Sequence, residues 1–135
     1  MKSIVSILIV DDDADDREII IDAFMSNNSK AEYVPLGNGD ALMQYLHKNK
    51  DNGLPALIML DLNMPGKDGR EALRELKSME AFQKIPTIVF TTSSSDRDKQ
   101  MAYESGANCF VTKPDTFNKL VEVTGCILKL WLPEE

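Results

Sequence analysis

Short apolar segments alternate with segments of helical periodicity along the whole chain, and few folds are compatible with this alternation. Segments that are apolar on both faces are typical of parallel strands buried on both sides, and they occupy residues 4–10, 32–36, 56–60, 87–90 and 108–111. The intervening and final segments predict helices over residues 15–27, 40–48, 68–79, 96–105 and 115–132. Five strands that alternate with helices in this way favour an α/β fold, a doubly wound five-stranded parallel sheet of (βα)5 type with right-handed crossovers.

The length of the chain predicts one domain. Its 135 residues match the usual size of a single domain, and an apolar fraction of 43% is ordinary for a protein with a packed core. We therefore expect residues 1–135 to form a single domain, without a separate sensor or output domain.

The charge balance limits the kinds of binding partner, and the cysteines and the first residues indicate the cellular compartment. The chain has 15 basic and 22 acidic residues, a net charge of −7, and lacks the basic clusters that bind nucleic acid or an anionic membrane. The first apolar run is too short to span a membrane and leads into carboxylates without a cleavage site, so we expect no signal peptide. Two cysteines form neither a disulfide framework nor a metal site. We expect a cytoplasmic protein that binds neither nucleic acid nor membranes.

Reactive side chains collect directly after four of the five predicted strands. The carboxyl ends of parallel strands meet at one edge of an open sheet, which is where ligands bind. The residues in question are Asp11, Asp12, Asp13, Asp15 and Asp16 after the first strand, Asp61 after the third, Thr91, Thr92 and Ser93 after the fourth, and Lys113 after the fifth. The sequence therefore predicts a polar site at this edge.

These residue types together favour phosphoryl-transfer chemistry. Carboxylates at one point repel one another unless a cation neutralises them or they take up protons, and Mg²⁺ prefers oxygen ligands of this kind. A lysine supplies a positive charge for a phosphoryl or carboxylate group, and an aspartate beside Mg²⁺ can act as a nucleophile. Phosphoryl transfer requires mainly positioning and charge neutralisation, and this edge can supply both.

The chain resembles the receiver domains of response regulators in two-component signalling over essentially its whole length. The matching segments are Ile-Leu-Ile-Val-Asp-Asp-Asp at 7–13, Leu-Asp-Leu-Asn-Met-Pro-Gly-Lys-Asp-Gly at 60–69, Ile-Pro-Thr-Ile-Val-Phe-Thr-Thr at 85–92, Ser-Gly-Ala-Asn-Cys-Phe at 105–110 and Val-Thr-Lys-Pro at 111–114. The resemblance implies a flavodoxin-like strand order, 2-1-3-4-5. Segments 90–95, 107–110 and 131–132 further resemble the stand-alone receivers associated with cyanobacterial phytochrome kinases.

The resemblance assigns the phosphoryl acceptor and the metal ligands. Asp61 is implied to be the phosphoacceptor. Asp11 and Asp12 are implied to hold Mg²⁺ (or Mn²⁺) together with Asp61, with Asp12 the more direct ligand of the first pair. The backbone carbonyl of Asn63 is implied to complete the protein's share of the coordination.

The resemblance also assigns the residues of the switch. Thr91 is implied to bond a phosphoryl oxygen and to move toward it. Lys113 is implied to pair with Asp61 and then with the phosphoryl group, and a cis peptide bond before Pro114 is implied to aim Lys113 inward. Phe110 occupies the position of the switch aromatic residue, which turns inward when Thr91 moves.

Three of these residues bear on how the switch works and is reset. Phe110 stands where the best-known receivers have tyrosine. A switch that uses a hydroxyl group is therefore excluded here, whereas a switch by rotation of the apolar side chain is still possible. Asn63 and Ser93 occupy positions where the family tunes the attack of water on the phosphoryl group. Neither is a carboxylate that could orient water strongly, so we predict self-catalysed dephosphorylation that is not exceptionally fast.

The other acidic residues have structural interpretations as well. Asp13 can cap the first helix, and Asp15 and Asp16 suit the positive N-terminal end of that helix. The alternative is that these three residues influence the metal site from outside its ligand shell. Asp68 is expected to cap the third helix.

Several further residues are expected to serve the fold alone. Gly66 and Gly69 are interpreted as turn glycines that shape the loop before the third helix. His47 is expected to be a surface residue, because it lies on a polar helix face without the helical-bundle context of a phosphorelay histidine. Cys109 and Cys126 are expected to be buried apolar residues.

The implied function is a switch rather than a classical enzyme. A partner histidine kinase is expected to donate the phosphoryl group, and the surface of the fourth helix, fifth strand and fifth helix is expected to signal to another protein. Trp131 belongs to an apolar stripe on the last helix that either closes the core or extends this surface for homodimerisation.

Three other functions are compatible with parts of the pattern. A phosphatase of the haloacid-dehalogenase type needs an acid two residues after its nucleophile, where this chain has Asn63. A flavin-binding protein of flavodoxin type needs a phosphate-binding loop after the first strand, where Asp11, Asp12 and Asp13 would repel phosphate. A phosphorylation-independent scaffold of the same fold remains open, although the intact acid, threonine and lysine set argues against it.

Overall fold

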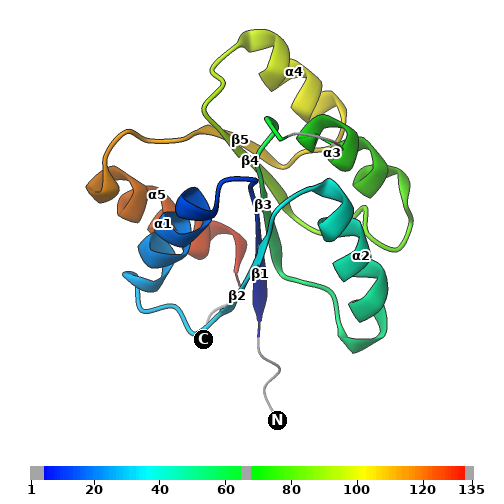
Figure 1. The fold of residues 1–135 in the computed structure, drawn as a ribbon, viewed down its shortest axis with the longest axis horizontal. Helices are drawn as coiled ribbons and strands as arrows, with labels where there is room; N and C mark the ends of the chain where they lie inside the picture. Colours follow the sequence, from blue (N-terminus) through cyan, green and yellow to red (C-terminus); the bar gives the residue numbers. More distant parts are fainter. Residues whose placement is uncertain (1–4, 65–67, 133–135) are drawn as a thin grey trace.

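The computed structural model describes residues 5–64 and 68–132 of the chain. Within these ranges five parallel strands form one sheet in the order β2-β1-β3-β4-β5, as Figure 1 shows. The strands are β1 Ser6–Val10, β2 Glu32–Leu36, β3 Leu57–Leu60, β4 Thr87–Thr91 and β5 Cys109–Thr112. The helices are α1 Ala14–Met25, α2 Gly39–Asn49, α3 Gly69–Ser78, α4 Asp96–Glu104 and α5 Phe117–Trp131, with a short 3-10 helix η1 at Lys50–Asn52. The predicted α/β fold and strand order are confirmed.

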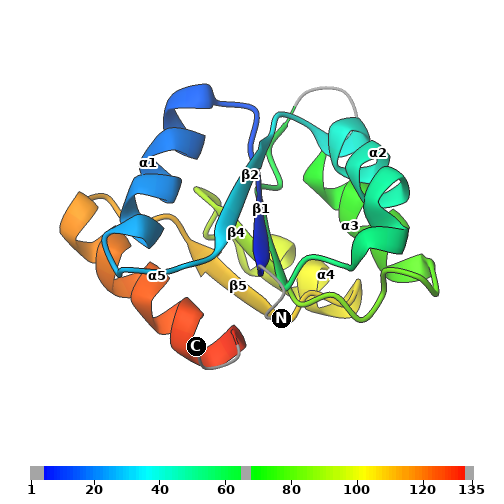
Figure 2. The same ribbon diagram turned by 90° about the horizontal axis from the view of Figure 1, so that it is seen from below.

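The sheet is the middle of three layers. Helices α1 and α5 cover one face, and α2, α3 and α4 cover the other (Figures 1 and 2). The alternation of side chains along β1 divides the core accordingly, because Leu8 and Val10 pack in the cluster on the α2–α4 side while Ile7 and Ile9 pack in the cluster on the α1 and α5 side. This covering on both faces explains why the central strands are apolar throughout.

Side-chain caps fix where the helices begin. Asp13 caps α1 by accepting hydrogen bonds from the backbone N–H groups of Asp15 and Asp16, and Asp68 caps α3 by accepting from the N–H of Glu71. Both capping predictions are confirmed. Helix α5 begins at Phe117, two residues later than predicted, because Thr116 is its cap.

The last helix shows which of its apolar residues serve the core. Leu120, Thr124 and Ile127 are buried. Leu120 and Ile127 belong to the core cluster on the α1 and α5 side of the sheet, and Trp131 is partly buried against that cluster. The interpretation in which Trp131 helps to close the core is therefore supported. No helix in the part of the chain that the structure describes is long and apolar enough to cross a membrane.

The two cysteines depart from prediction to different degrees. Cys126 is exposed, because it lies outside the stripe of α5 that faces the sheet, so the expectation that it is buried is wrong. Cys109 is only partly buried and packs against the α1 and α5 side of the core. His47 is exposed, as predicted, and its ring lies edge-on to Phe82 with centroids 5.1 Å apart.

Candidate functional site

The carboxyl ends of β1, β3, β4 and β5 bring the predicted site residues to one edge of the sheet. Asp11 directly follows β1, Asp61 directly follows β3, and Thr91 is the last residue of β4. Lys113, after β5, lies with its Nζ 2.6 Å from a carboxylate oxygen of Asp11 and 3.2 Å from one of Asp61. The predicted convergence of the strand ends is therefore present in the structure.

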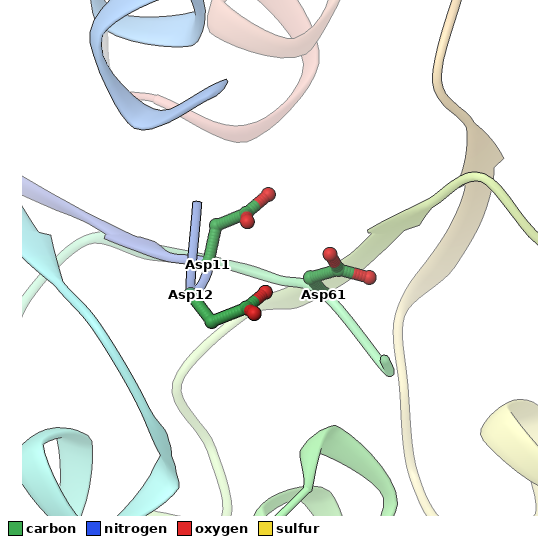
Figure 3. Close-up of side chains that lie close together, drawn as sticks. All are labelled: Asp11, Asp12 and Asp61. Atoms are coloured by element: carbon green, nitrogen blue, oxygen red, sulfur yellow. The ribbon is translucent and has the colours of Figure 1, made fainter. Parts of the chain in front are cut away.

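Three carboxylates form an acidic cluster, defined here as Asp11, Asp12 and Asp61. One oxygen from each lies within 4.8 Å of the others, and Figure 3 shows Asp11 and Asp12 beside Asp61. Asp11 and Asp61 are only 2% and 6% exposed, whereas Asp12 is exposed. Burial raises the pKa of Asp11, and the hydrogen bond from Lys113 only partly offsets this effect. The cluster thus combines buried acids with a side open to solvent.

The donor set of the acidic cluster fits a hard divalent cation. Carboxylate oxygens are the ligands that Mg²⁺ and Mn²⁺ prefer, and the exposed Asp12 leaves an approach from water. Asn63 contacts the cluster through its backbone N–H, which donates to Asp61 at 3.1 Å. The role of its carbonyl group as a ligand stays a prediction.

Lys113 is shared among three carboxylates. Besides Asp11 and Asp61, its Nζ lies 3.1 Å from Asp16, a contact that the sequence did not reveal. Burial alone lowers the pKa of Lys113, but the hydrogen bond and the charge of Asp11 and the charge of Asp61 outweigh it and raise the pKa above its usual value. Lys113 is therefore a firmly charged ammonium group at the centre of the acids.

The peptide bond before Pro114 differs from the expectation. No cis peptide bond occurs among residues 5–64 and 68–132, so the expected cis bond between Lys113 and Pro114 is wrong. The trans form is intrinsically favoured by about 0.5–1 kcal/mol. Here Lys113 reaches Asp11 from a trans backbone, with its own N–H donating to the carbonyl of Thr91 at 2.7 Å.

The hydroxyl of Thr91 is held by the loop that follows Asp61. Thr91 is fully buried, and its Oγ1 accepts a hydrogen bond from the side-chain amide of Asn63 at 3.3 Å. Ser93 lies further along the β4–α4 loop and donates its hydroxyl to Asp98 at 2.7 Å. Both residues that were predicted to tune dephosphorylation are thus engaged with protein groups.

An ion pair that the sequence did not reveal joins α3 to α4. Arg70 donates through Nη2 to both carboxylate oxygens of Asp98 at 3.0 Å and through Nη1 to the carbonyl of Leu62 at 3.4 Å. The hydrogen bond from Ser93, followed by those from Arg70, lowers the pKa of Asp98. From the sequence, Asp98 is indistinguishable from an ordinary acid in the first turn of a helix.

Gly69 has a tighter role than the one predicted for it. It is buried as the first residue of α3, and a Cβ built on it would overlap the backbone carbonyl oxygen of Asp61. The interpretation of Gly69 as a residue that only shapes a turn is therefore wrong, because its missing side chain lets the helix approach Asp61. Gly66 lies outside the described residues.

Phe110 is buried in this structure. The residue is 9% exposed and belongs to the cluster on the α2–α4 side of the sheet. Its backbone N–H, on the edge strand β5, donates to the hydroxyl of Tyr103 on α4 at 3.1 Å. The inward position that was expected after phosphorylation is therefore already occupied here.

An open hollow of about 310 Å³ adjoins the site between α1 and the start of α5. Lys113 and Asp16 line it together with the apolar side chains of Ile19 and Phe117. These two apolar side chains are 46% and 47% exposed. A partner that occupies the hollow would thus meet apolar surface next to the ammonium group of Lys113.

Comparison with known proteins identifies the family. Residues 7–124 match the response regulator receiver domain. The response regulator Rcp1 of Synechocystis sp. is 34% identical over 93% of this chain and 88% of its own length. The probable methanogenesis regulatory protein FilR2 of Methanothrix harundinacea is also 34% identical, over 93% of this chain and 83% of its own length.

Solved structures of similar fold agree with this match. The phosphorylated cyanobacterial phytochrome response regulator RcpA has a TM-score of 0.88 and 33% identity, over 96% of this chain and 95% of RcpA. The Mn²⁺-bound form of Rcp1 has a TM-score of 0.84 and 33% identity, over 97% and 96%. The expected likeness to phytochrome-associated receivers is confirmed. The chain therefore belongs to the response regulator receiver domain family.

Proposed function

We propose that this protein is a phosphorylation-dependent signalling switch that accepts a phosphoryl group on Asp61. The observation that carries the proposal is the pairing of the buried Asp61 with the ammonium group of Lys113 inside a cluster of acids that fits Mg²⁺. The similar proteins include a phosphorylated regulator and an Mn²⁺-bound one, which supports the same chemistry here. The protein then acts as a phosphoacceptor rather than as a classical enzyme.

A histidine kinase is the proposed donor. A carboxylate oxygen of Asp61 attacks the phosphorus of a phosphohistidine, a P–O bond forms as the P–N bond breaks, and the electron pair stays on the imidazole nitrogen, which takes a proton from water. Bound Mg²⁺, held by Asp11, Asp12, Asp61 and the carbonyl of Asn63, supplies neutralisation of the crowded negative charge. The exposed apolar side chains of Ile19 and Phe117 beside Lys113 suit the docking of the kinase.

Lys113 and Thr91 then stabilise the phosphoryl group. The ammonium group of Lys113 already lies 3.2 Å from Asp61 and can pair with a phosphoryl oxygen there. The hydroxyl of Thr91 accepts a hydrogen bond from Asn63, and a hydroxyl can donate while it accepts. Its proton is therefore available for a phosphoryl oxygen once Thr91 moves toward Asp61.

The signal leaves through the surface of α4, β5 and α5. Thr91 ends β4, which pairs with β5, and Phe110 lies on β5 beneath α4, where Tyr103 holds its backbone. Because Phe110 is already buried here, phosphorylation stabilises an arrangement that the chain can adopt without it, which is a shift of population between two states. The recipient is a downstream protein or a second copy of this chain. Sedimentation with and without beryllofluoride, a phosphoryl mimic, distinguishes a monomer from a homodimer.

The phosphoryl group is lost by self-catalysed hydrolysis. Water attacks the phosphorus, the P–O bond to Asp61 breaks, and the carboxylate is released with inorganic phosphate. The side-chain amide of Asn63 is engaged with Thr91 and the hydroxyl of Ser93 with Asp98. Neither is a carboxylate that orients water strongly, so the decay is slower than in the fastest chemotaxis receivers, as measured with labelled phosphate.

Intact mass spectrometry with acetyl phosphate tests the proposal directly. We expect a gain of one phosphoryl group with Mg²⁺, no gain with EDTA and no gain in Asp61→Asn. Asp96→Asn, which removes an exposed acid of α4 outside the acidic cluster, is the matched control and gains the group normally.

Two results would contradict the proposal. A phosphoryl gain that persists in Asp61→Asn would show that another residue is the acceptor. No gain in the wild type, with acetyl phosphate or with phosphorylated histidine kinases that label a control receiver, would favour a phosphorylation-independent scaffold.

A further inference from the structure

Among the described residues, Asp16 is the one ion-pair partner of the Lys113 ammonium group that lies outside the acidic cluster. It lies in the first turn of α1, and its carboxylate is 43% exposed and 3.1 Å from Nζ of Lys113. The other two partners, Asp11 and Asp61, both belong to the cluster that fits a divalent cation. Asp16 therefore differs from them in being able to bind Lys113 without also being a candidate metal ligand.

Each carboxylate oxygen of Asp11 and Asp61 already accepts a hydrogen bond. In Asp11, Oδ1 accepts from the N–H of Asp13 at 2.9 Å while Oδ2 accepts from Lys113 at 2.6 Å. In Asp61, Oδ1 accepts from the N–H of Asn63 at 3.1 Å while Oδ2 accepts from Lys113 at 3.2 Å. A divalent cation held by these two carboxylates would share their oxygens with the ammonium group.

Two positive charges bound to the same carboxylates repel each other. The side chain of Lys113 is only 12% exposed, so water screens this repulsion poorly. The ammonium group can avoid it by shifting toward its remaining acceptor. Among the three carboxylates that Lys113 contacts, that acceptor is Asp16.

We propose that Asp16 is a positioning residue that holds the ammonium group of Lys113 when Mg²⁺ occupies the acidic cluster. This proposal rests on the proposed function, because it takes the cluster to be the Mg²⁺ site. In the Mg²⁺-bound state Asp11 and Asp61 are engaged by the metal, so Asp16 stabilises the ammonium group of Lys113 more than it does in the free state, where all three acids share it. This difference in stabilisation strengthens Mg²⁺ binding.

Asp15 provides a matched control for charge and position. It is the neighbour of Asp16 in the first turn of α1 and is exposed, so Asp15→Asn removes the same charge from the same helix end. Within the described residues the ion pairs of Lys113 are with Asp11, Asp16 and Asp61, and not with Asp15. Any effect of general negative charge on Mg²⁺ binding therefore falls on both variants, whereas an effect through Lys113 falls on Asp16→Asn alone.

Calorimetric titration of the full chain with MgCl₂, without a phosphoryl donor, measures the effect. We expect Asp16→Asn to weaken Mg²⁺ binding about three- to fivefold, as expected for a half-exposed ion pair, and Asp15→Asn to weaken it less than about twofold. Asp16→Glu, which keeps a carboxylate, recovers most of the lost affinity. In a Lys113→Met background the two asparagine variants become equal.

The outcomes separate this proposal from the proposed function. Equal affinities of Asp16→Asn and Asp15→Asn, no recovery in Asp16→Glu, or a difference that survives in Lys113→Met would overturn the role of Asp16. If the Mg²⁺ affinities of the variants are as expected but Asp61 gains no phosphoryl group, the proposed function is wrong and the role of Asp16 stands. Absence of Mg²⁺ binding in the wild type would overturn the metal site and this proposal with it.

Discussion

Gly69, the first residue of α3, packs directly on the backbone carbonyl of Asp61. A Cβ at Gly69 would overlap that carbonyl oxygen and would lie 2.5 Å from the Cα of Leu62. The N–H of Gly69 also donates to the carbonyl of Leu62 at 3.0 Å. The start of α3 is thus bound to the segment that carries the proposed phosphoacceptor, through a contact that only glycine allows.

Gly69→Ala is therefore expected to destabilise the protein by about 2–3 kcal/mol, because backbone atoms cannot move aside as a flexible side chain can. Gly37→Ala is the control, since its Cβ would meet only the side chain of Arg17 at 3.5 Å, and we expect a change within about 0.5 kcal/mol. Urea unfolding of both variants checks this. Equal stabilities of the two variants would refute the tight contact.

The hydroxyl of Thr91 is expected to transmit the signal rather than to accept the phosphoryl group. Thr91→Val preserves the shape of a buried residue and removes the hydrogen bonds that its hydroxyl accepts from the side-chain amide of Asn63 at 3.3 Å and from the N–H of Ser93 at 3.5 Å, at a cost of about 1–2 kcal/mol. We expect acetyl phosphate still to label Asp61, whereas the NMR shifts of α4 and β5 on labelling largely disappear. Thr87→Val, at the opposite end of β4 and equally buried, retains the shifts. Unaltered shifts in Thr91→Val would exclude this role.

The ion pair between Arg70 and Asp98 predicts a pH-dependent contribution to stability. The pKa of Asp98 is lowered by Ser93 and Arg70, so its contribution is fully present above the usual aspartate pKa of about 3.9 and is lost as the pH falls through the lowered value. We expect Asp98→Asn to cost about 1 kcal/mol at pH 7, since both side chains are partly buried, at 29% and 19% exposure, and the contact with Arg70 is bidentate.

Urea unfolding of the wild type and Asp98→Asn from pH 7 to about pH 3 measures this contribution. The difference in unfolding free energy is expected to stay constant down to about pH 5 and to shrink below about pH 4. Asp96→Asn, another acid in the first turn of α4, shows a smaller difference. A difference for Asp98→Asn that grows at low pH would contradict the sign.

Asn27 is expected to matter for stability and not for signalling. It lies just after α1, and its side-chain amide joins that end of the helix to α5 by donating to the carbonyl of Val121 and the hydroxyl of Thr124, both at 3.1 Å. Asn27→Ala is expected to cost about 1–2 kcal/mol in unfolding free energy and to leave Mg²⁺-dependent labelling of Asp61 intact. Asn49→Ala, which removes a bond within one helix only, costs less. If Asn49→Ala lowers the unfolding free energy more than Asn27→Ala does, the hydrogen bonds from Asn27 to α5 are not important for stability.

The order of the elements and the main residues of the site can be predicted from the sequence. Alternation of apolar and helical segments is a local property of the chain, and a parallel sheet places every strand end at one edge. That rule alone predicts that Asp11, Asp61, Thr91 and Lys113 lie close together. The caps Asp13 and Asp68 were equally predictable, because a cap bonds backbone groups only two or three residues away.

The pairing of these charged groups depends on how the elements pack in three dimensions. Asp16 and Asp98 have the sequence pattern of ordinary first-turn acids, yet they bind Lys113 and Arg70 across 97 and 28 residues. Gly69 has the pattern of a turn glycine, and its contact with Asp61 depends on where α3 meets the sheet. Such contacts depend on the angles and distances between packed elements to within an ångström, whereas the pattern of residue types specifies only the order of the elements and the faces that they bury.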